Sequence, residues 1–148
     1  MTLIRAARVT DLPMVFRQER AYIDEFEPAL ASGWLGLLDR HLQQWTENFG
    51  RMFIAEVDGD AVGYYFWQPD GTQAILASIC VLAAHRRTGI GAALLKHFEA
   101  DARHNGYRVL ALGVLRGNPA QTLYERAGYQ YLRDEGQYAC YELATVDR

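Results

Sequence analysis

Apolar residues in the first third of the chain recur at spacings of three and four, which is the period of an α-helix. The clearest helical face is formed by Trp34, Leu38, Leu42, Trp45 and Phe49. An earlier helix is predicted from Thr10-Asp11 to about Phe26, because Pro13 would occupy its first turn, where a missing N–H costs little. The segment 3–7 before it alternates weakly and predicts a first strand.

Short apolar runs between turn residues predict the strands of a sheet. The predicted strands are 51–57, 61–67, 74–82, 108–114, 129–134 and 137–144. Asp58-Gly59-Asp60 joins the first two as a hairpin, because Asp-Gly tolerates positive φ. The run 108–114 is apolar throughout and is therefore predicted to be central in the sheet.

Two further helices are predicted in the second half of the chain. The helix 89–104 has an apolar face formed by Ile90, Leu94, Phe98 and Ala102. Asn105-Gly106 ends this helix, and a shorter one runs from Asn118-Pro119 to Gly128. The predicted order is strand, two helices, three strands, helix, strand, helix and two strands. This order defines a mixed α/β sheet with helices on its faces.

Composition narrows the class of protein. The chain has 148 residues, of which 50% are hydrophobic and 22% charged, so we expect one globular domain spanning 1–148. The net charge of −3 argues against a nucleic-acid partner. The longest apolar run, 74–84, is too short to cross a bilayer, and the N-terminus lacks the apolar core of a secretion signal. We therefore expect a cytoplasmic protein with no membrane partner.

The two cysteines, Cys80 and Cys140, both lie in apolar, strand-like runs. We interpret them as reduced residues of the core, as is usual in the cytosol. No CxxC pair and no cluster of cysteine and histidine stands out in the sequence, so we expect no metal site.

The segment "RRTGIG" at 86–91 joins an apolar strand to a helix, a position that suits phosphate. The N–H groups and the dipole at a helix N-terminus attract an anion, and glycines let the anion approach the backbone. The pattern of a P-loop is absent. A dinucleotide fingerprint matches only in part, and Arg116 stands where its acidic residue would lie. The third interpretation is that this segment binds the pyrophosphate of coenzyme A.

Two motifs in the chain resemble the GNAT superfamily of N-acetyltransferases. "RRTGIG" fits the signature [QR]-x-x-G-x-[GA], and "GNPAQTLYERAGYQ" at 117–130 is similar to the later motif N-x-x-A-x-x-L-Y-x-x-x-G-[FY]. The chain departs from the second motif at its central alanine, which is replaced by Gln121 or displaced to Ala120. The resemblance implies a mixed, mostly antiparallel sheet of about seven strands, flanked by about four helices and splayed at its central strands. It also implies acetyl-CoA as cosubstrate and an amine as acceptor.

The resemblance also implies roles for individual residues. The loop implied to bind the pyrophosphate, largely through main-chain N–H groups, consists of Arg86, Arg87, Thr88, Gly89, Ile90, Gly91 and Ala92. The backbone of Ile79, Cys80 and Val81 is implied to pair with the pantetheine arm, and an N–H there to polarise the thioester carbonyl. Asn118 is either a helix cap alone or a cap that also contacts pantetheine. Tyr124 is the candidate catalytic acid, because a phenol with a pKa of about 10 is protonated at neutral pH and can protonate the departing thiolate.

The group that takes the proton of the amine stays open at this point. Glu56 on a neighbouring strand, a carboxylate within 24–27 and a water chain are the alternatives. We predict the acceptor pocket between the first two helices and the central strands. Its acidic and aromatic residues would be Asp24, Glu25, Glu27, Tyr22, Phe26 and Trp34, which suit a cationic amine.

The sequence therefore predicts an N-acetyltransferase. It would move an acetyl group from acetyl-CoA to a primary amine of a small molecule or peptide by direct transfer in a ternary complex. The alternative is a non-catalytic acyl-CoA-binding or sensing module on the same fold. Tyr124 favours the enzyme, because it could act as the catalytic acid. The strand 74–82 has no carboxylate that could act as the base, so the non-catalytic module stays an alternative. A homodimer is compatible with either, and the use of acyl groups other than acetyl stays open.

Overall fold

The computed structural model describes residues 2–144, and its strands form one sheet. The strands are β1 (Thr2–Ala6), β2 (Met52–Val57), β3 (Asp60–Asp70), β4 (Gln73–Val81), β5 (Val109–Leu115), β6 (Gln130–Glu135) and β7 (Tyr138–Ala144). They lie in the order β1-β2-β3-β4-β5-β7-β6. Neighbouring strands are antiparallel except β4 and β5, which are parallel. The predicted mixed, mostly antiparallel sheet is confirmed.

Five α-helices lie within residues 2–144, where about four were expected. They are α1 (Leu12–Phe26), α2 (Ala31–Gly36), α3 (Leu38–Glu47), α4 (Ile90–His104) and α5 (Ala120–Arg126). The single helix predicted through 34–49 is wrong, because Leu37 leaves the helical conformation with φ −110° and ψ 22° directly after Gly36. The break changes the direction of the following side chains, and Leu42 is 46% exposed instead of buried.

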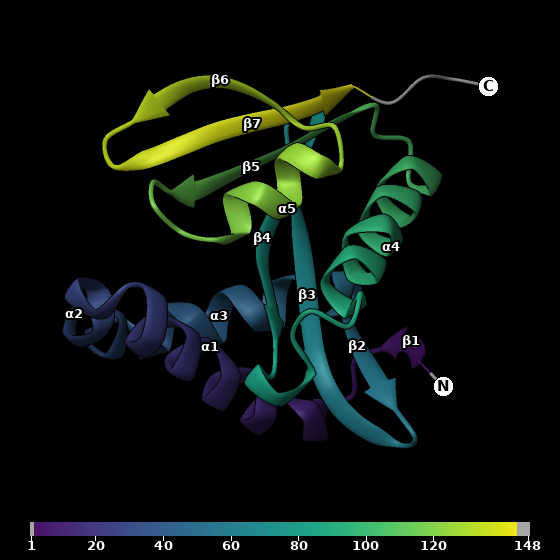
Figure 1. The fold of residues 1–148 in the computed structure, drawn as a ribbon. Helices are drawn as coiled ribbons and strands as arrows, with labels where there is room; N and C mark the ends of the chain where they lie inside the picture. The colour runs from purple at the N-terminus through teal and green to yellow at the C-terminus, as the bar shows by residue number, and fades with distance from the viewer. Residues whose placement is uncertain (1, 145–148) are drawn as a thin grey trace.

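Two apolar cores lie on opposite faces of the sheet, because side chains alternate along β3. Tyr65 and Trp67 belong to the core beneath α4, where both rings contact Phe98. Tyr64 and Phe66 belong to the core beneath α1–α3, together with Trp45. Figure 1 shows α1, α2 and α3 on one side of the molecule, and α4 with α5 on the other.

The sheet splays at its centre. β4 and β5 are paired only from Gln73 and Val109 to Ile75 and Ala111. Beyond these pairs β4 stays with β3 as far as Val81, whereas β5 stays with β7. In Figure 1 the group formed by β5, β7 and β6 lies across the top and turns away from β2–β4, with α5 in front of the opening. The predicted splay between the central strands is confirmed.

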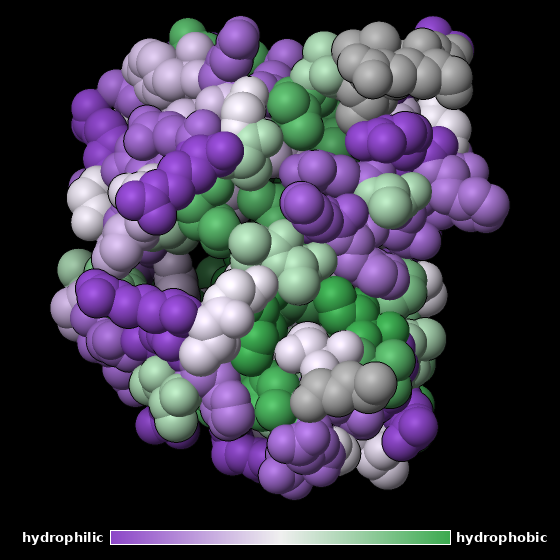
Figure 2. All heavy atoms as spheres, turned by 45° about the vertical axis from the view of Figure 1, so that its right-hand side comes forward, coloured by the Kyte–Doolittle hydropathy of each residue, from purple (hydrophilic) through white to green (hydrophobic). Residues whose placement is uncertain are grey.

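The outer surface is mixed in character. On the face drawn in Figure 2, hydrophilic residues cover most of the surface and apolar residues form a band between them. Large apolar side chains that are exposed on the β6–β7 hairpin are Tyr131, Leu132 and Tyr138. Across residues 2–144, no helix is both long and apolar enough to cross a membrane.

Candidate active site

A cavity of about 230 Å³ lies where β4 and β5 diverge. It brings together residues of α1, both central strands, α5 and β7. The polar side chains of its lining are Glu19, Tyr22, Glu27, Ser78, Cys80, Asn118, Tyr124 and Tyr138. Residues of five elements therefore meet at the splay.

The β4 edge of this cavity is a strand with one free side. Ile79, Cys80 and Val81 pair with β3 on one side, and the β4–β5 ladder ends before them at Ile75. Gly63 permits a close approach of β3 here, because a Cβ on it would lie 2.8 Å from the carbonyl oxygen of Cys80. A strand edge of this kind can pair with an extended ligand through its main chain.

The N-terminus of α4 has the geometry of an anion site. Gly89 precedes the helix with φ +85°, a left-handed conformation that side chains disfavour. The N–H of Ala93 donates to the carbonyl of Gly89 at 3.0 Å, which closes the first helical turn. The N–H groups of Ile90, Gly91 and Ala92 precede this bond, at the positions where a helix leaves its donors free. Together with the helix dipole they present partial positive charge.

The side chains of the preceding loop point in different directions. Arg87 is exposed and has φ 63°, and the Thr88 hydroxyl donates to the carbonyl of His85. The Arg86 guanidinium is directed to the end of α1, where it donates to both carboxylate oxygens of Glu25 and lies over the ring of Phe26. Its Nε also donates to the carbonyl of Val81 at 3.2 Å. Arg86 therefore links the loop to α1.

Asn118 joins the start of α5 to the end of α1. Its Oδ1 accepts from the N–H of Ala120 at 2.9 Å, and its Nδ2 donates to the Tyr22 hydroxyl at 2.6 Å and to Glu27 at 3.0 Å. The side chain is thus a cap for α5 and also a fixed part of the cavity wall. Burial raises the pKa of Tyr22 to about 12.

Tyr124 lies on α5 with 5% of its surface exposed, and it lines the cavity. Its ring contacts Tyr129 in an edge-on arrangement. Burial raises the pKa of its phenol, and nearby Tyr22, Cys80 and Glu27 raise it further. Tyr124 is therefore protonated at neutral pH, which is the state that a proton donor requires.

Neither cysteine has the environment of a nucleophile. Cys80 is buried, its Sγ lies 3.6 Å from the Tyr64 hydroxyl, and burial raises the pKa of its thiol to about 12. Cys140 is half-buried on β7, and the pKa of its thiol is also raised by desolvation. A thiol with a raised pKa is poorly nucleophilic at neutral pH.

The carboxylates considered from the sequence are separated by the fold. Glu56 bonds to Arg5 on β1 and does not line the cavity. Glu27 lines the cavity, Glu25 is paired with Arg86, and Asp24 is exposed. Trp34 is buried in the core beneath α1–α3.

Glu19 was not among the predicted site residues, although it lines the cavity. It lies on α1 between Val15 and Ile23, at spacings of four on either side, and both of these neighbours are buried. The sequence signal was therefore a charged residue on the apolar face of the first helix. No group of three or more metal-ligating side chains occurs in the described part of the chain.

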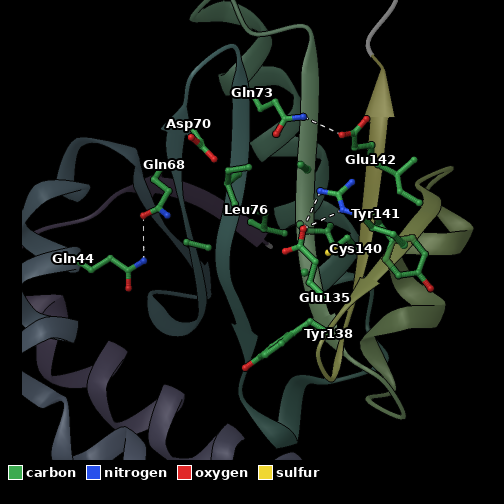
Figure 3. Close-up of a pocket in the computed structure, with 17 residues that line it drawn as sticks. Gln44, Gln68, Asp70, Gln73, Leu76, Glu135, Tyr138, Cys140, Tyr141 and Glu142 are labelled. Carbon is green, nitrogen blue, oxygen red and sulfur yellow. Dashed lines mark hydrogen bonds and ion pairs between the residues drawn. The ribbon is translucent and has the colours of Figure 1, made fainter.

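A second hollow of about 510 Å³ lies between β4, β5 and the β6–β7 hairpin (Figure 3). Ala77, Gly113 and Tyr138 line both this hollow and the splay cavity. Its charged lining residues are Asp70, Arg133, Glu135 and Glu142. Figure 3 shows Tyr138 reaching from β7 toward β4 at one end of the hollow. Three carboxylates against one guanidinium make this hollow acidic.

Comparison with known proteins identifies the family. Residues 18–129 match the Acetyltransferase (GNAT) family, and the chain belongs to this family of acyltransferases. An N-alpha-acetyltransferase from Sulfurisphaera tokodaii is 28% identical over 144 residues, which cover 88% of this chain and 81% of that protein.

Solved structures share the fold over nearly the whole chain. The PaiA N-acetyltransferase from Thermoplasma acidophilum, in complex with coenzyme A, matches with a TM-score of 0.83 at 17% identity and covers 97% of this chain and 99% of its own. The ribosomal-protein-alanine N-acetyltransferase from Brucella melitensis matches with a TM-score of 0.78 at 25% identity, covering 96% and 99%. The expectation of a GNAT acetyltransferase is confirmed.

Proposed function

We propose that this protein transfers the acetyl group of acetyl-CoA to a primary amine of a small molecule or peptide, directly in a ternary complex. The observation that carries the proposal is the splay beyond Ile75 and Ala111, which opens a cavity lined by Tyr124. The PaiA relative was solved with coenzyme A, and its fold is the fold of this chain. Family membership supports an enzyme over a purely sensing module.

The chain's own residues would hold acetyl-CoA in two places. The pyrophosphate would lie on the loop 86–92, where the N–H groups of Ile90, Gly91 and Ala92 precede the first bonded turn of α4. The pantetheine arm would pair with the free edge of β4 at Ile79, Cys80 and Val81. Acetyl-CoA supplies a thioester whose carbonyl carbon the amine attacks.

Tyr124 would then protonate the departing thiolate, and Asn118 would hold the cavity wall beside it. The cysteines support direct transfer, because burial raises the pKa of the Cys80 thiol to about 12 and leaves it a poor nucleophile. In place of the pocket predicted between the first two helices and the central strands, the acceptor would approach through the acidic hollow, whose carboxylates Asp70, Glu135 and Glu142 favour a cationic amine.

A panel of amines tests the function. Purified protein is mixed with acetyl-CoA and, in turn, polyamines, free amino acids and short peptides with free N-termini, and thiol release is followed. We expect steady turnover with at least one amine and acetylated product by mass spectrometry. Tight binding of acetyl-CoA without turnover on any amine would favour the sensing module instead.

A further inference from the structure

The splay cavity holds a carboxylate that the proposed function leaves unused. Glu19 lies in the middle of α1, where the Tyr64 hydroxyl donates to its Oε2 at 3.2 Å and the indole N–H of Trp34 donates to its Oε1 at 3.5 Å. The Tyr64 hydroxyl also lies 2.9 Å from the hydroxyl of Ser78, which lines the cavity. A chain of hydrogen bonds therefore runs from the cavity wall to Glu19.

Glu19 is the only group in this chain of hydrogen bonds that can take up a proton at neutral pH. Tyr64 on β3 and Cys80 on β4 stay protonated, because burial raises the pKa of both. Burial also raises the pKa of the Glu19 carboxyl, while the hydrogen bonds from Trp34 and Tyr64 and the nearby His41 of α3 favour its ionised form. The other ionisable groups of the cavity are Tyr22, Glu27, Tyr124 and Tyr138.

The alternative carboxylates are already engaged. Glu56 is paired with Arg5, and Glu25 with Arg86. Glu27 accepts a hydrogen bond from Asn118, which holds it to the start of α5. Glu19 differs because one of its two hydrogen-bond donors, Tyr64, is a hydroxyl, which can pass a proton on.

We propose that Glu19 takes the proton of the amine during acetyl transfer, through the hydroxyls of Ser78 and Tyr64; this inference rests on the proposed function. A cationic amine first loses one proton to water; as the neutral nitrogen then bonds to the acetyl carbon, its remaining excess proton passes to Ser78, the Ser78 proton to Tyr64, and the Tyr64 proton to Glu19. The C–S bond breaks with its electron pair on sulfur, and Tyr124 protonates that thiolate. Glu19 releases its proton to water and water reprotonates Tyr124, which balances the step.

The decisive variant is Glu19→Gln, which keeps the size of the side chain and an oxygen that can accept from Tyr64. We expect kcat to fall about 10²-fold or more, with little change in the Kd of acetyl-CoA. With an acceptor amine of low pKa, which stays neutral over the range tested, the fall of wild-type kcat at acid pH, where Glu19 is protonated, should be absent from the variant. Glu19→Asp should restore this acid limb at a lower rate, and Tyr64→Phe should lower kcat because the path is broken.

Glu99→Gln is the matched control. Glu99 lies on α4, is half-buried, accepts from the Tyr129 hydroxyl at 3.2 Å and also has a pKa raised by burial, but it does not line the cavity. We expect wild-type kcat. Carbon-13 NMR of labelled glutamate carboxyls gives a readout independent of turnover. One resonance with a raised pKa should vanish in Glu19→Gln, a different one in Glu99→Gln, and only the former should match the acid limb.

Three results would overturn the inference. One is wild-type kcat in Glu19→Gln. Another is an effect of Glu19→Gln confined to the KM of the amine, which would make Glu19 an electrostatic anchor. The third is a Glu19 resonance that does not titrate with the acid limb. In each of these cases the proposed function still holds as long as the wild-type protein acetylates an amine. A wild-type protein that acetylates no amine overturns both the proposed function and this inference.

Discussion

The Nη1 of Arg86 donates to both carboxylate oxygens of Glu25, at 2.9 and 2.8 Å. This contact joins the loop before α4 to the last turn of α1, and the guanidinium carbon also lies 4.9 Å from the centre of the Phe26 ring. One side chain therefore ties the loop before α4 to α1, the helix that lines the splay cavity. The pair is partly exposed, so its contribution to stability is small and depends on salt.

Arg86→Ala and Glu25→Gln separate the two roles open to Arg86. Both variants break the same ion pair, and we expect each to lose less than about 1 kcal/mol of unfolding free energy. Only Arg86→Ala removes positive charge beside the proposed pyrophosphate site, so only it should weaken acetyl-CoA binding, by a few fold in low salt. Calorimetry at two salt concentrations measures this. An equal loss of affinity in both variants would assign Arg86 to holding α1.

Tyr124→Phe tests the proposed acid. The ring and its contact with Tyr129 remain, and only the hydroxyl is lost. We expect kcat to fall about 10²-fold while the Kd of acetyl-CoA hardly changes, because the hydroxyl acts in the transition state. Tyr129→Phe is the control, since Tyr129 is also buried but its hydroxyl bonds to Glu99 outside the cavity. Wild-type kcat with an unchanged pH profile in Tyr124→Phe would make Tyr124 a packing residue.

Gly89→Val tests the anion site at the start of α4. A valine at φ +85° is strained, and we expect a loss of about 2 kcal/mol of unfolding free energy. Gly59→Val in the β2–β3 turn imposes similar strain, because Gly59 has φ +89° and a Cβ on it also meets open space. Only Gly89→Val should abolish acetyl-CoA binding in a folded protein. Calorimetry that found equal affinities in the two variants would remove the site from this loop.

Asp11→Asn tests the link between β1 and α1. Arg5 donates to both oxygens of Asp11 at 2.8 and 2.9 Å, and these hydrogen bonds lower the pKa of that carboxyl. A folded-state pKa below the unfolded value of 3.8 stabilises the fold above that pH, and the gain is lost as the pH falls through the folded-state pKa. We expect Asp11→Asn to cost about 1–2 kcal/mol at pH 7 and progressively less below pH 4, by urea unfolding.

Asp134→Asn is the control for this effect. Asp134 pairs with Arg116 in an exposed position, so its loss should change the unfolding free energy by less than about 0.5 kcal/mol at pH 7. Equal costs for the two substitutions, or a cost of Asp11→Asn that does not decrease as the pH falls below 4, would contradict the assignment.

Elements whose signals are local could be predicted from the sequence. Ile90, Leu94, Phe98 and Ala102 are all buried on one face of α4, because helical periodicity acts over a few residues. The helix predicted through 34–49 failed at Leu37, where one non-helical residue changes the direction of all that follow. Periodicity describes an unbroken element and contains no information on where a break falls.

The candidate site could be predicted only where a motif marked it. Tyr124 and Asn118 stand in such a motif, and both line the cavity. The contacts of Asn118 with Tyr22 and Glu27 span 96 and 91 residues, and no local pattern records them. Glu19 was missed for the same reason, because its partner Tyr64, and Ser78 to which Tyr64 bonds in turn, come from strands far along the chain.

The shared wall of the two hollows has a consequence for inhibition. Ala77, Gly113 and Tyr138 face the splay cavity and the acidic hollow alike, so the two spaces adjoin across the sheet. A single molecule that joined coenzyme A to an amine through a two-carbon bridge at sulfur would place one half in each space. Binding of the coenzyme A half would raise the effective concentration of the amine half at the acidic hollow. An amine that binds weakly by itself could therefore bind tightly once it is attached to coenzyme A. The splay between β4 and β5 would thus let one conjugate occupy the cofactor site and the acceptor site together.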